Sequence, residues 1–243
     1  MSGEDLDAAS ELAAIGYFGK VPVRGDFVQR RLPRSFLDPW DDWLQGAVAA
    51  SKSQLGDGWL DSYLTSPIWR FALSAGICGD VPVAGVLMPS VDSVGRYYPM
   101  TIVLLQPRSG HPFAFAARAQ PWFAAAEEAI LGCLDDGFEL SALDDRLGGL
   151  ADLSAGWREG DARIEAMPEP VGGGLGFHVN GAAVDRWFPD AYGGLLDCIL
   201  RDRFARYSLW WTAGSDRVPA GLRMYGGFPA EVDFADFLGA AAP

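Results

Sequence analysis

The sequence predicts an α/β fold, a three-layer α/β/α sandwich on a mixed, largely antiparallel sheet. Three apolar, β-rich runs lie within residues 68–107, separated by clusters of Gly, Pro, Asp and Ser. Apolar residues recur at helical spacing before and after this block. Residues 100–105, MTIVLL, are almost continuously apolar, which is typical of a central strand covered on both faces. Helices are therefore expected on both sides of the sheet, and an α+β arrangement with helices on one face is the alternative.

The first helix is expected over residues 35–55. Trp40 and Trp43 belong to its apolar face, and either Ser35 or Asp38 can cap its start. A shorter helical turn follows and stops at a Ser-Pro pair, since the residue before proline disfavours the helical conformation. The three apolar runs come next and read as adjacent strands, antiparallel to one another.

A further helix is expected over residues 121–135, because Pro121 suits a first helical turn. Its inward face comprises Phe123, Ala126, Ile130, Leu131 and Leu134. The remaining elements expected are a helix over 140–150, a strand over 175–179, a helix over 190–206, a strand over 208–214 and a terminal helix over 232–238. One of Trp210 and Trp211 should face the core and the other solvent or a covering helix. Residues 1–14 are expected to be a flexible leader, and residues 15–243 a single domain.

Composition limits the possible partners. The formal net charge of −13 and the pI near 4.5 disfavour nucleic acid and anionic membranes, because both repel an acidic body. No stretch of 18 apolar residues exists, so membrane insertion is not expected. The three cysteines lie far apart without a CxxC pair, which argues against zinc and disulfides. The sequence therefore predicts a reduced, cytoplasmic protein.

No catalytic, cofactor-binding or metal-binding residues are expected. The GYFGK stretch ending at Lys20 lacks the spacing and the hydroxyl residue of a phosphate-binding loop, since Val21 and Pro22 follow it. The chain has no GxSxG motif, and its two histidines, His111 and His178, accompany no nucleophile motif. The acidic doublets are explained by solvated helix surfaces and caps. The sequence thus predicts a protein that is not an enzyme.

Two loops are dense in residue types that favour protein contact. Residues 16–33 combine glycines, prolines and basic side chains, and residues 89–99 join two strands through a turn with Asp, Gly, Arg and two Tyr. Loops held by a rigid sheet are common recognition sites, and Arg with Tyr is typical of binding hot spots. The candidate partner-binding residues are Lys20, Arg24, Gly25, Asp26, Phe27, Ser90, Asp92, Arg96, Tyr97 and Tyr98.

The polar residues of these loops also permit a structural role or a ligand-binding role. Asp26 or Asp92 can pair with Arg24, Arg70 or Arg96 in a buried network that ties the two loops together. Alternatively, the charged residues can line a pocket for a small or phosphorylated ligand, or an undetected active site. That pocket would use Lys20, Arg24, Asp26, Asp92 and Arg96.

A family resemblance rests on the same stretches. The segment GYFGKVPVRGDFVQRRLPRSFLDPWDDWL resembles the amino-terminal signature of the TagF family, also called ImpM, of proteins associated with type VI secretion. The similarity continues through SPIWRFALSAGICG and GVLMPSVDSVGRYYPMTIV, and more loosely to SLWWTAG near the carboxyl end. The resemblance covers most of the chain from Gly16.

The resemblance implies a cytoplasmic, non-catalytic regulator that represses a type VI secretion system after translation. It also implies binding to a forkhead-associated scaffold protein of the apparatus. Composition and spacing do not indicate either property; they indicate only two loops suited to protein contact.

Overall fold

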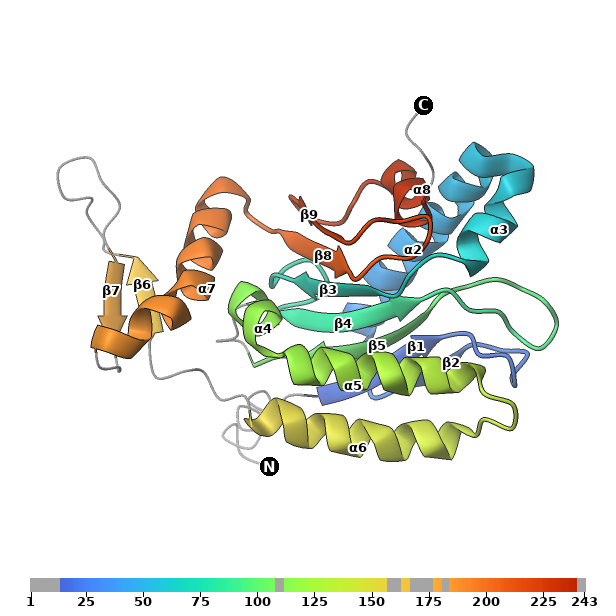
Figure 1. Ribbon diagram of the computed structural model, residues 1–243, viewed down its shortest axis with the longest axis horizontal. Helices are drawn as coiled ribbons and strands as arrows, with labels where there is room; N and C mark the ends of the chain where they lie inside the picture. The colour runs from blue at the N-terminus through green and yellow to red at the C-terminus, as the bar shows by residue number, and fades with distance from the viewer. Residues whose placement is uncertain (1–13, 108–111, 157–162, 167–176, 181–183, 240–243) are drawn as a thin grey trace.

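The computed structural model describes residues 14–107, 112–156, 163–166, 177–180 and 184–239 (Figure 1). A seven-stranded open sheet runs in the order β2-β1-β5-β4-β3-β8-β9. Its strands are β1 (Ala14–Gly19), β2 (Val28–Arg30), β3 (Trp69–Leu73), β4 (Val83–Met88), β5 (Met100–Leu105), β8 (Ser208–Thr212) and β9 (Gly221–Tyr225). A separate two-stranded sheet pairs β6 (Arg163–Ala166) with β7 (Phe177–Asn180). The predicted leader, apart from Ala14, lies outside the described residues.

The prediction of a mixed sheet is wrong. Every pairing among the described strands is antiparallel. β3, β4 and β5 follow one another through loops, and a chain that returns at once to the neighbouring position must reverse its direction. The predicted antiparallel order of these three strands is confirmed. β5 lies between β1 and β4 and is almost wholly buried, as its continuous apolar sequence predicts.

The helices are α2 (Arg34–Leu55), α3 (Trp59–Leu64), α4 (Pro112–Arg118), α5 (Gln120–Leu131), α6 (Leu140–Gly156), α7 (Val184–Arg203) and α8 (Phe234–Phe237). Short 3-10 turns lie at Gly56–Gly58, Gly132–Leu134 and Glu231–Asp233. Among these described elements, no helix has the length and apolar character needed to cross a membrane.

Side chains alternate between two cores on opposite faces of the sheet. Phe71 and Trp210 belong to one buried cluster, which also contains the aromatic face of α2 and residues of α3 and α8. Val86 and Ile102 belong to the other, which contains the inward faces of α5 and α6. Successive strand residues point to opposite faces, so one strand supplies both cores. Helices packed through these clusters support the three-layer sandwich, whose exact layering stays a prediction.

Two local predictions about the helices are wrong. Neither Ser35 nor Asp38 caps α2: the helix begins at Arg34, and the carbonyl of Pro33 accepts hydrogen bonds from two backbone N–H groups of the first turn. Leu131, the last residue of α5, and Leu134, in the 3-10 turn after it, are exposed, while Trp122 and Ala129 of α5 join the buried face instead. The helix ends at Leu131 and continues as a 3-10 turn, whose different rotation per residue carries Leu134 outwards.

β1 and β2 form where only a loop was expected. Position 16 in β1 has to be glycine, because a Cβ atom there would lie 2.2 Å from the carbonyl oxygen of Arg30 on β2. Gly19 ends β1 at a φ of 143°, and a Cβ atom there would lie 2.2 Å from the carbonyl oxygen of Pro99. These glycines permit close approach of neighbouring backbones, and they also hide the strand pattern from the sequence.

Candidate functional site

Two loops meet at the same end of the sheet. The first loop, residues 20–27, connects β1 to β2, and the second loop, residues 89–99, connects β4 to β5 (Figure 1). The backbone N–H of Ser93 donates to the carbonyl of Arg24 over 3.0 Å. The hydroxyl of Ser90 donates to the carbonyl of Lys20 over 2.7 Å. The two loops are therefore joined directly by hydrogen bonds between segments some 70 residues apart.

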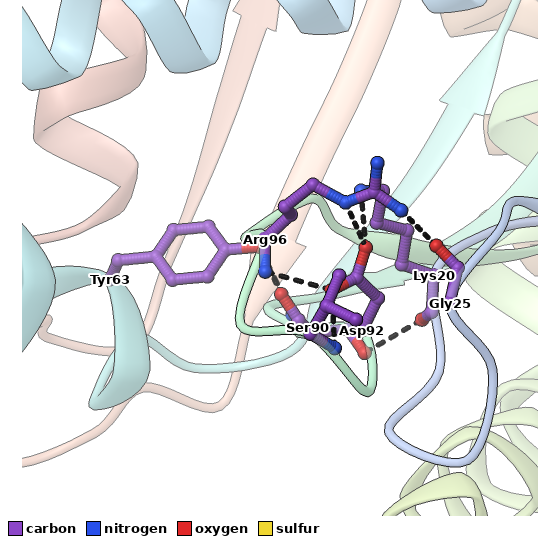
Figure 2. A network of polar contacts seen from close by, with 7 residues as sticks. Lys20, Gly25, Tyr63, Ser90, Asp92 and Arg96 are labelled. Atoms are coloured by element: carbon purple, nitrogen blue, oxygen red, sulfur yellow. Dashed lines mark hydrogen bonds and ion pairs between the residues drawn. The ribbon is translucent and has the colours of Figure 1, made fainter.

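Asp92 is the centre of the contact between the loops (Figure 2). One carboxylate oxygen accepts hydrogen bonds from Lys20 Nζ at 2.7 Å and from Arg96 Nε at 2.6 Å. The other accepts the backbone N–H groups of Val94 at 3.0 Å and Arg96 at 2.8 Å. Burial alone raises the pKa of Asp92, but the hydrogen bonds from Lys20 and Arg96 outweigh it and hold the pKa well below its usual value. Asp92 is thus a buried, charged anchor.

Arg96 and Tyr63 extend this network in two directions (Figure 2). The guanidinium of Arg96 also donates to the carbonyl of Gly25 in the first loop. Tyr63, on α3, donates its hydroxyl to the Ser90 carbonyl and accepts the Ser90 N–H, both over 3.0 Å. Burial raises the pKa of Tyr63 above its usual value. The second loop is therefore fixed to α3 as well as to the first loop.

An aromatic cluster supports the other side of the first loop. The ring of Phe27 stacks on Phe18 of β1 at a centroid distance of 5.4 Å and meets the Tyr98 ring edge-on at 4.8 Å. The ammonium of Lys20 lies 5.1 Å from the centre of the Phe27 ring. Tyr98 donates its hydroxyl to Asp41 on α2 over 2.6 Å, and burial together with this bond raises its pKa. Phe27 is nevertheless 47% exposed.

The predicted site residues fall into three groups by exposure. Four are exposed, namely Arg24, Asp26, Phe27 and Arg96. Gly25 and Tyr97 are half-buried. The buried group comprises Lys20, Ser90, Asp92 and Tyr98. Buried side chains hold the loops and cannot touch a partner, so direct contact can come only from the exposed and half-buried groups.

The buried ion-pair network predicted as an alternative forms in part. Asp92 pairs with Arg96, and Lys20 is the second partner that the sequence did not assign to it. Arg70 takes no part, because both its Nε and Nη2 donate to the carboxylate of Glu127 on α5. The structure also adds two exposed apolar residues at the loop tips, Val23 and Val94. Their only sequence signal is an apolar side chain inside a turn.

A shallow hollow of about 560 Å³ lies beside the first loop, between β2 and the start of α6. It is lined by Tyr17, the run Arg24–Arg30, Leu140 and Asp144. Of the five charged residues proposed for a ligand pocket, Arg24 and Asp26 line it, whereas Lys20, Asp92 and Arg96 do not. The five residues therefore do not converge on one cavity.

The remaining titratable candidates lie elsewhere. His111 lies outside the described residues, and His178 lies in β7 opposite Glu165 of β6. Burial raises the pKa of Cys133 to about 12, which keeps it a thiol at neutral pH. Among the described residues, no three His, Cys, Asp or Glu side chains are placed to share a metal ion.

The family model described as "TagF N-terminal domain, Type VI secretion system-associated" matches residues 16–150 of the chain, more than half of its length. The chain belongs to the TagF family. Both loops of this TagF-family protein lie inside the matched segment, whereas β8 and β9 lie beyond it. The resemblance seen in the sequence is thereby confirmed.

A solved structure agrees with this assignment. PA0076 from Pseudomonas aeruginosa PAO1 is 34% identical to this TagF-family chain, covers 94% of it and is itself covered to 96%, with a TM-score of 0.76. No curated protein sequence matches the chain.

Proposed function

We propose that this TagF-family protein is a non-catalytic repressor that acts after translation on a type VI secretion system. It works in the cytoplasm by binding a forkhead-associated scaffold protein of the apparatus. It acts as one domain over residues 15–243, a three-layer sandwich that presents both loops at one end. Membership of a family associated with type VI secretion supports this proposal.

One observation carries it: a buried ion-pair network fixes two loops and leaves Arg24, Asp26, Phe27 and Arg96 on the surface. Arginine and aromatic side chains dominate the energetics of protein interfaces. Side chains already held in place lose less conformational entropy on binding, so preorganised loops favour affinity. The candidate surface consists of these four residues together with Gly25, Tyr97, Val23 and Val94.

Arg24 offers the cleanest test, because its side chain is exposed and makes no ion pair among the described residues. Arg24→Glu should weaken binding of the purified scaffold protein at least about tenfold, as expected for a charged hot-spot residue. Its urea unfolding curve should match that of the wild type. The matched control is Arg203→Glu, an exposed arginine at the end of α7.

Calorimetric titration of the scaffold protein measures both variants. Unchanged affinity in a folded Arg24→Glu protein, or an equal loss in Arg203→Glu, would contradict the assigned surface.

The hollow beside the first loop favours a ligand-sensing function, and a second hollow of about 430 Å³ adjoins it at Val23, Arg24 and Phe138–Ser141. The volume of the first hollow lies within the range of small-molecule sites, and Arg24 and Arg30 line it. Thermal shifts with millimolar nucleotides and phosphopeptides test this function, since a ligand that binds the folded state raises the melting temperature. No shift with any of them would rule against it.

A further inference from the structure

We infer that the partner is held through an extended segment that adds a strand to the open edge of β2, in the hollow beside α6. A carboxylate of that segment is bound by Arg24 and Arg31. This step rests on the proposed function and names the mode of binding. It assigns a role to β2, a strand that the sequence pattern does not reveal.

The edge of the sheet is open at β2. β2 is the terminal strand and pairs, among the described strands, with β1 alone. A terminal strand presents backbone N–H and C=O groups that a further extended chain can pair with. β2 is three residues long, with Gln29 and Arg30 exposed. A short edge of this kind suits a brief partner segment better than a whole sheet.

The hollow follows this edge. Its lining contains every residue from Arg24 to Arg30, opposed by Leu140 and Asp144 of the first turns of α6. Arg30 and Asp144 form an ion pair at 3.0 Å, which links the strand to the helix. A groove between an edge strand and a helix offers backbone pairing on one wall and side-chain contacts on the other. Phe27, half exposed at the loop end of the groove, provides an apolar contact.

The charged residues around the groove indicate which side chains the partner's segment should carry. Residues 16–34 hold five basic side chains and one acidic side chain in a protein of net charge −13. Three of these basic groups are already paired, with Asp92, Asp144 and Asp38. Arg24 and Arg31 are exposed and have no ion pair among the described residues. Arg24 lines the hollow, and Arg31 directly follows β2 in the chain. Unpaired guanidinium groups before and after the edge strand favour a carboxylate on the incoming strand.

The backbone of Arg31 supports this assignment. Its φ of 55° makes it the one described non-glycine residue in the left-handed region. Glycine or asparagine adopts this conformation at lower cost than arginine. Residues in such conformations persist only where the surrounding structure holds them, and they cluster at functional sites.

Hydrogen exchange of the full-length protein with and without the purified scaffold protein tests this mode of binding. We expect slower exchange at the amides of residues 28–31, because an added strand occupies the outward-facing groups. Protection of residues 93–96 without any change at residues 28–31 would overturn the added strand and leave the proposed function standing. Unchanged exchange in both segments would overturn both.

Substitution of Arg31 supplies an independent readout. Arg31→Gly relieves the left-handed backbone, so its unfolding midpoint should equal or exceed that of the wild type. Its dissociation constant for the scaffold protein should nevertheless rise about tenfold, and Arg31→Lys should restore part of the affinity. Wild-type affinity of the folded Arg31→Gly protein would overturn the role given to this arginine.

Discussion

Asp92 shows how single residues set the shape of the candidate surface. Its carboxylate receives two cationic donors and two backbone N–H groups while wholly inaccessible to solvent. An unpaired buried charge is strongly disfavoured, so each of these groups depends on the others. The exposed residues of both loops are therefore held by a side chain that no partner can reach.

The ionisation of Asp92 has a definite effect on stability. Its pKa is lower in the folded protein than in the unfolded chain, so ionisation stabilises the folded state. This contribution is complete above the unfolded value of about 4 and is lost as the pH falls towards the folded value. Asp92→Asn should therefore be less stable than the wild type at pH 7, and the difference should shrink below about pH 4.

Urea unfolding from pH 3 to pH 8 measures this difference, with Asp26→Asn as the exposed control. A difference that persists undiminished at pH 3 would show that Asp92 is not the titrating group.

Gly19, the last residue of β1, tests how closely this end of the strand approaches Pro99 of the second loop. Gly19→Ala should destabilise the protein by about 1–3 kcal/mol or more, because the new Cβ atom would collide with the Pro99 carbonyl at an unfavourable φ. Gly95→Ala is the matched control: its φ of 85° is also unfavourable, but no atom lies within 4 Å of the new Cβ. It should cost only about 1 kcal/mol. If urea unfolding showed the same loss of stability in both variants, the close approach of Gly19 to Pro99 would be contradicted.

At the level of elements, α2 is the main helix on its face of the sheet. Trp40 is wholly buried and contacts the rings of Phe71 and Trp210 on neighbouring strands. Trp40→Ala should cost about 3–5 kcal/mol in the free energy of unfolding, because the cavity cannot close against a rigid sheet. Leu222→Ala on β9, where the side chain is 61% exposed, should change it by less than about 0.5 kcal/mol.

Urea denaturation followed by circular dichroism compares these two variants. A small effect of Trp40→Ala would show that α2 packs less closely than described.

The strand over 208–214 and the helix over 140–150 were predicted and are present as β8 and α6. The best-predicted elements have a clear apolar period. β3, β4 and β5 and the body of α2 follow from apolar repeats that local turns do not disturb. β1 has no clear sequence pattern because Gly16 and Gly19 replace side chains where backbones pass closely, and β2 has none because it is only three residues long. A strand whose glycines serve contacts far away in the chain has no local signature.

The candidate site was predicted to a similar degree. Residue types located both loops, and the sequence placed acidic and basic groups in each. It could not separate the buried Lys20 and Asp92 from the exposed Arg24 and Asp26, since burial here depends on contacts between segments distant in the chain. The hollow beside β2 was equally invisible, because α6 forms its other wall.

At the scale of the whole molecule, the seven-stranded sheet is completed by β8 and β9, which lie after the segment that matches the family model. β8 pairs with β3 in a register that places Trp210 opposite Phe71, and both belong to the core beneath α2. A fragment ending at residue 150 would leave β3 as an open apolar edge and remove Trp210 and Phe237 from the core.

We therefore expect the fragment 1–150 to aggregate or to unfold without a cooperative transition. Solubility and urea denaturation measure this outcome. A soluble fragment with a sigmoidal transition would show that residues after 150 are dispensable for folding.

The net charge of −13 shapes how the molecule meets a partner. A strongly acidic body repels other acidic surfaces at long range, whereas the arginines of the two loops attract carboxylates only at close range. Long-range repulsion from the net negative charge thus disfavours contact with other acidic surfaces. Specific binding has to come from short-range contacts of the loop surface.

Photo-crosslinking inside the native cells tests most directly whether the two loops form one protein-binding surface. A benzophenone amino acid replaces Val23 in the first loop, Val94 in the second loop, or Leu222 on β9, all exposed apolar residues. We expect positions 23 and 94 to crosslink to the same protein, identified by mass spectrometry as a component of the type VI apparatus, and position 222 to give no such product. Crosslinks to that protein from position 222 alone, or from neither loop, would contradict the account.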